Sequence, residues 1–230
     1  MKKLLNVTLF GLDCVDIERL IKVADICCEN FEFAKIKLLS SLPSTNKNVI
    51  KIKSISSLKE YSQFMLKEMN DYIDTDFVLI IQHDGFILNP DAWDDSYLNY
   101  DYIGAPLYVE GKQIVGNGGF SLRSKKLLQI LQTDENIYID ENPDHKYGQH
   151  EDWIISVING QYLENKGIKF APVELAHKFS FEKNRIFGPK WNGQFGFHGL
   201  TWTDISDWIK ENPQYGIKNE LREKPNQHFD

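Results

Sequence analysis

The first half of the sequence alternates short apolar runs with segments of helical periodicity, and this alternation restricts the fold more than any other feature. Strands are predicted for the apolar runs at residues 4–10, 31–39, 49–52 and 77–81. Apolar residues spaced three and four apart predict helices over residues 17–28 and 58–72. Ser57 and Glu60 have the spacing of a capping box at the start of the second helix. Strands that alternate with helices favour an α/β fold with a mainly parallel sheet.

The second half of the sequence is less regular and is rich in aromatic residues and glycine. Shorter elements are predicted here, namely strands near 102–104 and 119–122 and helices near 124–131, 152–160 and 203–210. No internal repeat or linker divides the chain, and 230 residues are enough for one substantial core. We therefore predict a single domain over residues 1–215 and a polar C-terminal tail over residues 216–230.

The net charge and the cysteines narrow the class of partner and the compartment. A formal charge of -7 disfavours nucleic acid, because phosphate backbones are bound through an excess of Lys and Arg. The stretch 33–59 differs, since it holds six lysines and no acid; it is either a solvated basic face or a surface that attracts an anion. Cys14, Cys27 and Cys28 form no disulfide framework and suit a reducing compartment.

Nothing in the sequence predicts insertion into a membrane. The apolar start of the chain is interrupted by Asn6 and Thr8 and has no small-residue cleavage site, so a buried strand explains it better than a signal peptide. No window approaches the 18 apolar residues of a membrane span. We predict a cytoplasmic protein without a transmembrane segment, and peripheral contact with a membrane stays open.

Polar residues follow the predicted strands at their carboxyl ends, which is the edge where open parallel sheets bind ligands. Residues expected at this edge are Gly11, Asp13, Ser40 and Gln82–Gly85. The most apolar strand runs directly into Gln-His-Asp-Gly at 82–85. One interpretation is a turn closed by Asp84 and Gly85. The other is a carboxylate held rigidly for a hard cation that bridges diphosphate oxygens.

The segment 115–123 reads Val-Gly-Asn-Gly-Gly-Phe-Ser-Leu-Arg, with three glycines in four residues. Glycines permit unusual backbone conformations and let a ligand approach the main chain, although a tight loop before a strand would look the same. The segment is neither a dinucleotide fingerprint nor a P-loop, because it lacks the strand-loop-helix order and a Gly-Lys-Ser/Thr sequence.

Two acids, Glu151 and Asp152, open the helix predicted near 152–160. The helix dipole favours acids in a first turn in any protein. The same dipole keeps a carboxylate ionised, so either acid is a candidate base for an acceptor hydroxyl.

A late histidine, His198, stands in the sequence Phe-Gly-Phe-His-Gly. Small and aromatic neighbours allow its imidazole a close approach to a ligand, whereas a lone histidine is more often a structural hydrogen-bonding group. Competing candidates for a ligand role are His83, His145, His150 and His177.

Taken in chain order, these four segments resemble the DxD motif, glycine loop, xED motif and C-terminal histidine of the GT-A glycosyltransferases. The sequence is most similar to a family of uncharacterised GT-A-like domains, through Gln-x-Asp-Gly at 82–85, Asp-Tyr-Ile-Gly-Ala-Pro at 101–106 and Gly-Asn-Gly-Gly-Phe-Ser-Leu-Arg at 116–123. The resemblance spans roughly residues 5 to 205. It implies a single-domain GT-A-like fold with a Rossmann-like sheet, in which about 1–105 binds the nucleotide sugar and about 106–215 binds the acceptor.

The resemblance also implies roles for particular residues. Asp84 and His198 would hold a divalent cation, with Mn²⁺ favoured over Mg²⁺ for a mixed carboxylate, imidazole and phosphate set. Asp152 would be the general base, and Glu151 would orient the acceptor or share that role. Together with the sheet edge, the residues expected around the nucleotide sugar and acceptor are Gly11, Asp13, Ser40, Gln82, His83, Asp84, Asp101, Gly118 and Gly119.

The implied function is a metal-dependent and inverting transfer of a sugar from a nucleotide diphosphate donor, with a UDP-sugar favoured, to a hydroxyl of a glycan or glycoconjugate. One departure matters. Gln82 stands where the first acid of the DxD motif would be, so weak cation binding or a cation-independent variant stays open.

Two other functions stay open at this point. A metal-dependent phosphoesterase would use the same acids and histidines, although two-metal sites need more clustered ligands than the sequence offers. A non-catalytic carbohydrate- or nucleotide-sugar-binding module would stack sugars on aromatic side chains, although such side chains are more often core. The aromatic residues in question are Trp93, Trp191, Phe195, Phe197 and Trp202.

Overall fold

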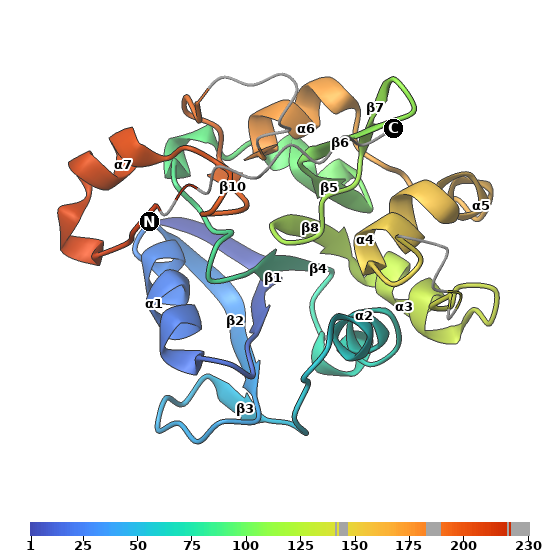
Figure 1. The fold of residues 1–230 in the computed structure, drawn as a ribbon, viewed down its shortest axis with the longest axis horizontal. Helices are drawn as coiled ribbons and strands as arrows, with labels where there is room; N and C mark the ends of the chain where they lie inside the picture. The colour runs from blue at the N-terminus through green and yellow to red at the C-terminus, as the bar shows by residue number, and fades with distance from the viewer. Residues whose placement is uncertain (141, 143–146, 183–189, 220, 222–230) are drawn as a thin grey trace.

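The computed structural model describes residues 1–140, 142, 147–182, 190–219 and 221, and a six-stranded sheet runs through its centre (Figure 1). The sheet has the order β3-β2-β1-β4-β8-β5. Its strands are β1 (Lys2–Leu12), β2 (Phe31–Ser40), β3 (Val49–Lys51), β4 (Phe77–Ile81), β5 (Tyr102–Gly104) and β8 (Ser121–Ser124). Neighbours among β1 to β4 pair in parallel, whereas β8 is antiparallel to β4 and β5. The predicted α/β fold with a mainly parallel sheet is confirmed.

Helices cover both faces of the sheet. In Figure 1, α1 lies on one side of β1 and β2, and α2 and α3 lie on the other side. The helices are α1 (Ile17–Cys28), α2 (Leu58–Lys67), α3 (Lys125–Thr133), α4 (Glu151–Trp153), α5 (Gly160–Asn165), α6 (Val173–Phe179) and α7 (Ser206–Glu211). Short 3₁₀ turns occur at Met69–Tyr72, Pro90–Ala92, Asp95–Asn99 and Pro213–Tyr215.

Alternate side chains of the central strands enter two separate cores. In β1, Leu9 packs into the core that contains α1, whereas Phe10 packs into the core that contains α2. In β4, Leu79 and Ile80 divide in the same way, and all four side chains are buried. Successive side chains of a strand point to opposite faces, so a strand buried on both faces has to be apolar throughout. This is why continuous apolar runs predicted these strands.

The start of α2 confirms the predicted cap. The hydroxyl of Ser57 accepts the backbone amide of Glu60 at 3.2 Å. The Glu60 carboxylate in turn accepts the amide of Ser56 at 2.7 Å. The Ser57 side chain therefore caps the first turn of α2, and the Glu60 side chain in that turn holds the residue before the cap.

Several short elements in the second half have too few residues to show a periodicity, and the sequence pattern does not predict them. They are the hairpin β6 (Pro106–Val109) and β7 (Lys112–Val115), the helix α6, and the parallel pair β9 (Ser180–Phe181) and β10 (Gly196–Phe197). The hairpin turns at Glu110 and Gly111, whose φ angles of 48° and 79° suit a two-residue hairpin turn.

The helix predicted near 152–160 is interrupted. It begins as α4, passes through a π-helical turn at Ile154–Ile158, and continues as α5. The amide of Asn159 donates to the carbonyl of Ile154 at 3.0 Å, which is the i to i+5 bond of a π-turn. Such turns occur frequently at functional sites. Here the turn follows Asp152 almost directly.

Part of the lysine-rich stretch is paired within the fold. The ammonium groups of Lys35 and Lys37 lie 2.6 Å and 3.2 Å from the carboxylate of Asp74. No helix among the described residues is long and apolar enough to cross a membrane.

Candidate active site

The candidate site lies at the carboxyl ends of β1 and β4. The chain leaves β1 for β2 on one side, whereas β4 pairs with β1 on the other side, so the strand order reverses between β1 and β4. Open α/β sheets bind ligands in the crevice at such a point. A cavity of about 380 Å³ lies there. Its walls include Asp13, Cys14, Arg19, Ile55, Ser57, Tyr61, Gln82 and His83.

Asp13 follows β1 and is fixed in the cavity wall by three donors. Its Oδ1 accepts the amides of Val15 and Asp16 at 2.8 Å and 2.9 Å, and its Oδ2 accepts Nε of Arg19 at 2.6 Å. Burial raises the pKa of this carboxyl, but the Arg19 guanidinium and the two amides outweigh burial, and the pKa is lowered. Asp13 is therefore an ionised acceptor facing the cavity.

Residues Gln82–Gly85 form a tight turn after β4. The amide of Gln82 donates to the carbonyl of Gly85 at 2.8 Å, and the amide of Gly85 donates back at 3.0 Å. The turn interpretation is therefore correct, and it does not compete with a role for Asp84, whose side chain stays 16% exposed. The carbonyl of Asp84 accepts the amide of Gly199 at 2.6 Å, which ties this turn to the segment that carries His198.

His198 lies against the turn, although it is far away in the sequence. Its Nε2 lies 3.8 Å from Oδ1 of Asp84 and 3.2 Å from Oε1 of Gln82. Its Nδ1 lies 3.3 Å from Oε1 of Glu182 and 3.2 Å from the amide nitrogen of Asn117. Burial lowers the pKa of the imidazole, but the carboxylates of Glu182 and Asp84 outweigh burial and raise it to about 9.

Gln82 is oriented by a second partner. Its amide nitrogen donates to the hydroxyl of Tyr61 at 2.8 Å, which directs its amide oxygen toward His198. Gln82, the neutral residue at the first position of the motif, thus presents an oxygen to the same imidazole nitrogen that Asp84 approaches.

The glycine loop packs directly on these groups. A Cβ atom on Gly119 would lie 2.2 Å from Nε2 of His198, and one on Gly118 would lie 3.0 Å from Cβ of Asp152. The amide of Gly118 donates to Oδ2 of Asp152 at 3.2 Å. Adjacent glycines therefore contact the histidine and the acid, and only residues without a side chain permit both contacts.

Glu151 lies in a buried ion pair. Both of its carboxylate oxygens accept Nη2 of Arg123, at 2.9 Å and 3.2 Å, and the ring of Tyr102 lies 5.1 Å from the guanidinium carbon. Arg123 is 0% exposed and Glu151 is 5% exposed. Burial lowers the pKa of Arg123, but the Glu151 charge outweighs burial and raises it. We therefore remove Glu151 from the candidate bases, because its carboxylate is occupied in joining α4 to β8.

Asp152 has a different environment from its neighbour. Its Oδ2 accepts the amide of Gly118, and its Oδ1 accepts the amide of Trp153 at 2.8 Å. Burial, and then the charges of Glu151 and Glu182, raise the pKa of Asp152 to about 7. A carboxyl with a pKa near the working pH suits general acid–base catalysis.

The residues at the turn fit a hard divalent cation. Oδ1 of Asp84 and the amide oxygen of Gln82 both lie near Nε2 of His198, at 3.8 Å and 3.2 Å. In the part of the chain that the structure describes, no group of three or more His, Cys, Asp and Glu side chains could hold a metal. Substrate oxygens and water would have to complete the coordination, which is common for Mg²⁺ at phosphate-binding sites.

Two predicted ligand residues are buried away from the cavity. Gly11 lies within β1, and a Cβ atom there would meet the side chain of Leu20 at 2.7 Å. Ser40 is fully buried, and its hydroxyl accepts the amide of Leu42 at 3.1 Å. Both residues serve packing or local structure, and we remove them from the ligand-binding set.

Asp101 lies at the opposite edge of the sheet. Its carboxylate accepts the hydroxyl of Ser124 at 2.5 Å and the amide of Lys169 at 2.8 Å. Ser124 pairs with Phe77 at the amino end of β4, whereas Asp84 follows the carboxyl end. A five-residue strand is about 17 Å long, so Asp101 cannot reach the cavity and is also removed from the set.

Among the competing histidines that the structure describes, His83 lies as close to Asp84 as His198 does, and it remains a candidate ligand. His83 lines the cavity, its Nδ1 lies 3.7 Å from Oδ1 of Asp84, and burial lowers its pKa. His150 precedes α4, and His177 is exposed on α6. His145 lies outside the described residues.

The aromatic residues that suggested a sugar-stacking surface have other partners. Trp93, Phe195 and Phe197 are buried in the core, which confirms their interpretation as core residues. The indole nitrogen of Trp202 donates to Glu182 at 2.9 Å. Trp191 is partly buried against the same core.

Four residues of the site were given no role by the sequence analysis. Asn117 and Arg123 lie inside the specific string at 116–123, which could have pointed to them. Tyr61 belongs to the apolar spacing that predicts the helix over residues 58–72. Glu182 lies in no motif, and only the fold brings it to His198.

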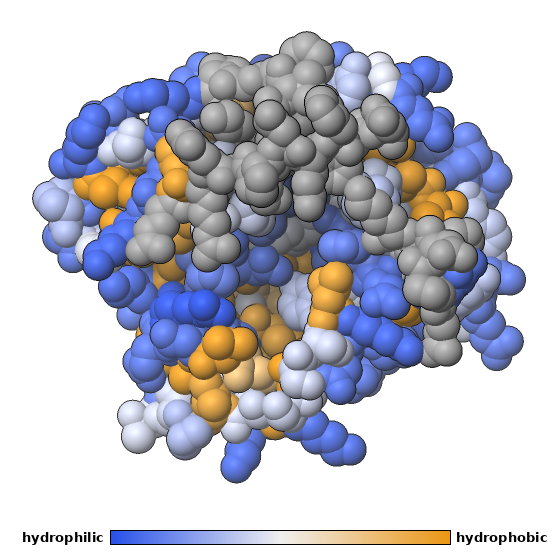
Figure 2. All heavy atoms as spheres, viewed as in Figure 1, coloured by the Kyte–Doolittle hydropathy of each residue, from blue (hydrophilic) through white to orange (hydrophobic). Residues whose placement is uncertain are grey.

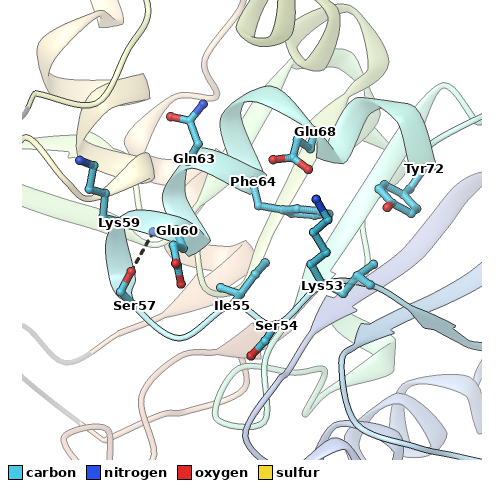
Figure 3. Close-up of a pocket in the computed structure, with 11 residues that line it drawn as sticks. Lys53, Ser54, Ile55, Ser57, Lys59, Glu60, Gln63, Phe64, Glu68 and Tyr72 are labelled. Atoms are coloured by element: carbon cyan, nitrogen blue, oxygen red, sulfur yellow. Dashed lines mark hydrogen bonds between the residues drawn. The ribbon is translucent and has the colours of Figure 1, made fainter.

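A second cavity, of about 680 Å³, lies on the other side of the segment that leads into α2 (Figure 3). It shares Ile55 and Ser57 with the first cavity. Lys53 extends toward Phe64 across this cavity in Figure 3, which also draws the hydrogen bond that the Glu60 amide donates to the Ser57 hydroxyl. Figure 2 shows apolar side chains gathered on this face between β3 and α2.

The fold and the site together define a class, namely an α/β protein with a cavity at the point of strand reversal beside a carboxylate–histidine cluster. The chain belongs to the family described as "Protein of unknown function (DUF5672)", whose sequence model matches residues 45–198. The matched region includes the turn at 82–85, the glycine loop, Asp152 and His198. No curated protein matches the chain.

Several solved structures are distantly similar to this one. The bifunctional IspDF from Campylobacter jejuni is 17% identical over 56% of this chain, with a TM-score of 0.41, and the chain covers 44% of its length. A glycosyltransferase involved in the glycosylation of the major capsid of PBCV-1 is 11% identical, with 90% of this chain and 98% of that chain covered and a TM-score of 0.49. The galactosyltransferase LgtC is 13% identical, with 94% and 98% covered and a TM-score of 0.44.

Proposed function

We propose that this protein is a metal-dependent glycosyltransferase that moves a sugar from a nucleotide diphosphate donor, a UDP-sugar in first place, to a hydroxyl of a glycan or glycoconjugate. The observation that carries the proposal is that His198 and Asp152 contact the adjacent glycines Gly119 and Gly118, while Oδ1 of Asp84 lies 3.8 Å from Nε2 of His198. This brings a place for a cation and a carboxyl with a pKa near 7 to one loop, next to the cavity at the strand ends.

In this proposal the nucleoside occupies the cavity at the ends of β1 and β4. Asp13 is ionised there and can accept hydrogen bonds from the base or the ribose hydroxyls. Gln82 and His83 line the same cavity and lead to Asp84. The diphosphate would extend from the cavity toward Asp84 and His198.

Asp84 and His198 would hold the divalent cation, with Mn²⁺ ahead of Mg²⁺ and with Gln82 offering its amide oxygen. When bound, the cation supplies positive charge that stabilises the departing nucleotide diphosphate. His198 has to release its Nε2 proton to become a ligand, since metal ligands bind in their deprotonated form.

Asp152 accepts the proton of the acceptor hydroxyl. The hydroxyl oxygen forms a bond to the anomeric carbon from the face opposite the nucleotide, the bond from that carbon to the diphosphate oxygen breaks, and the configuration inverts. The amide of Gly118 holds Oδ2 of Asp152 in place for this step. Positioned proton transfer of this kind contributes about 10²–10⁴-fold in rate.

The same proposal divides the domain of residues 1–215 into a donor half, about 1–105, and an acceptor half, about 106–215, followed by the tail at 216–230. Cys14, Cys27 and Cys28 are free thiols. This supports a cytoplasmic location for the proposed enzyme.

Thermal-shift measurements test donor binding. We expect a UDP-sugar with Mn²⁺ to raise Tm more than GDP-, dTDP- or CMP-sugars do, and more than the same sugar without metal. A ligand at 100 times its Kd stabilises the folded state by about 2.7 kcal/mol. A flat response to every nucleotide sugar would contradict the proposal.

Product analysis with the stabilising donor and a panel of glycan acceptors separates the remaining functions. Free nucleotide diphosphate together with a glycosylated acceptor supports a transferase. Release of phosphate from the donor would indicate a phosphoesterase, and binding without any conversion would indicate a non-catalytic module.

Replacing Gly119 by Ala is expected to displace His198. The new methyl group would lie 2.2 Å from Nε2 of the imidazole, so the ring has to move, whereas Gly119 has no positive φ angle and the backbone accepts Ala. A displacement of about 1 Å at a reacting centre can cost about 100-fold, and we expect kcat/KM to fall by this factor. Gly160→Ala is the matched control, because nothing lies within 4 Å of its Cβ position. Equal kcat/KM values for the two variants would contradict the assignment of His198.

A further inference from the structure

Glu182 joins three segments around the candidate cation site. Its Oε1 accepts the indole nitrogen of Trp202 at 2.9 Å and lies 3.3 Å from Nδ1 of His198. Its Oε2 accepts the side-chain amide of Asn117, the residue before the paired glycines. The Glu182 side chain is 18% exposed. Glu182 directly follows β9, and its carboxylate thus links this part of the chain to the glycine loop and to the segment of His198.

These contacts fix the orientation of the His198 ring. With Nδ1 directed at Glu182, the opposite nitrogen Nε2 faces Asp84 and Gln82. Gly119 packs against the same edge of the ring and leaves it little room to rotate. Of the two groups beside Nδ1, Glu182 is the acceptor for an Nδ1 proton, whereas the Asn117 amide nitrogen can only donate.

We propose that Glu182 is a positioning residue for the cation, which acts by holding His198 with Nε2 directed toward Asp84. The inference rests on the proposed cation site and extends it to a residue outside the four motifs. Histidine ligands of metals nearly always donate their second N–H to a carboxylate, a carbonyl or water, and loss of that partner typically costs 10–100-fold in metal affinity. The negative charge of Glu182 also favours a cation nearby.

The experiment is a titration of the full chain with MnCl₂ in the presence of UDP, followed by electron paramagnetic resonance of free Mn²⁺ and by calorimetry. We expect Glu182→Gln to weaken Mn²⁺ binding about 10–100-fold. Glu174→Gln removes the same charge from an exposed position on α6 and is expected to bind Mn²⁺ like the unchanged protein. Glu182→Asp keeps the charge, and we expect a smaller loss in the same direction.

The outcomes separate this inference from the proposed function. If Asp84→Asn weakens Mn²⁺ binding while Glu182→Gln leaves it unchanged, the cation site stands and the role of Glu182 is refuted. If the unchanged protein binds no Mn²⁺, both are refuted. A merely structural role would lower Tm and leave the Mn²⁺ affinity of the folded variant unchanged. Should Glu182→Gln fail to fold, Trp202→Phe removes one donor to the carboxylate, and unchanged affinity in that variant and in Glu182→Asp would overturn the inference.

Discussion

Asp152→Asn is expected to lower turnover by about 10²–10⁴-fold while donor binding is preserved. The amide has nearly the shape of the carboxyl, and its one oxygen can still accept one of the two backbone amides that bind Asp152, but it cannot take a proton from the acceptor. Steady-state kinetics with the stabilising donor give kcat, and the thermal shift with UDP and Mn²⁺ gives binding. Asp25→Asn, on the exposed side of α1, is the control for the loss of one acid. Full activity of Asp152→Asn would contradict the assignment of Asp152 as the general base.

The pH dependence of the proposed activity also follows from Asp152. Burial together with the charges of Glu151 and Glu182 raises the pKa of Asp152 to about 7, so the carboxyl is protonated and inactive as a base below this pH. At saturating Mn²⁺, which keeps the bound His198 deprotonated, we expect kcat/KM to increase as the pH rises through about 7 and then to level off. A rate that is independent of pH between 5 and 9 would contradict this assignment.

The stability of the protein should depend on Asp152 in the opposite direction. The pKa is about 7 in the folded state against 3.8 in the unfolded chain, so the folded state binds the proton more tightly. Its contribution to stability therefore falls as the pH rises from about 4 to 7. We expect the stability of Asp152→Asn relative to the unchanged protein to increase from pH 4, where both side chains are neutral, to pH 8.

Glu151→Gln is expected to have the contrary effect, a loss of stability of about 3–5 kcal/mol, because it leaves the buried charge of Arg123 without its counter-ion. The Arg123 side chain is 0% exposed, and its Nη1 already has no partner among the described residues. Urea unfolding at pH 7 measures the change. Glu164→Gln, at an exposed position of α5, is the control and should stay within about 0.5 kcal/mol.

A double variant distinguishes an unpaired charge from a general intolerance of change at this position. Replacing Glu151 by Leu and Arg123 by Met removes both charges, and replacing a buried pair by apolar residues is often neutral or stabilising. We therefore expect the double variant to be more stable than Glu151→Gln. If Glu151→Gln were as stable as the Glu164→Gln control, the ion pair would not support the fold as described.

Glu151 and Asp152 show what the sequence could and could not predict about the site. Both opened a helix and both were candidate bases, since the motif places them side by side. In the fold the two acids have different partners, because consecutive residues of a helix point in different directions. Glu151 points to Arg123 in the core, and Asp152 points to the glycine loop.

The predicted ligand residues divide in a similar way. Asp13, Gln82 and His83 meet at one cavity, as expected for residues that follow neighbouring parallel strands. Gly11 and Ser40 also lie at strand ends, but packing against α1 and a local hydrogen bond keep them from the cavity. Asp101 begins the motif at 101–106, but it also directly precedes β5. The antiparallel pairing of β5 with β8 places Asp101 at the amino end of β4, away from the cavity at the carboxyl end.

The sequence by itself determined the strands β1, β2 and β4, the helices α1 and α2, and the edge of the sheet at which the cavity lies. These features follow from local patterns, since strands buried on both faces must be apolar and a helical face repeats every three to four residues. Tertiary structure alone decided that Glu182, Asn117 and Tyr61 hold His198 and Gln82. Contacts between residues so distant in the sequence depend on how β9, the glycine loop and α2 are placed around the sheet, and no local periodicity records that placement.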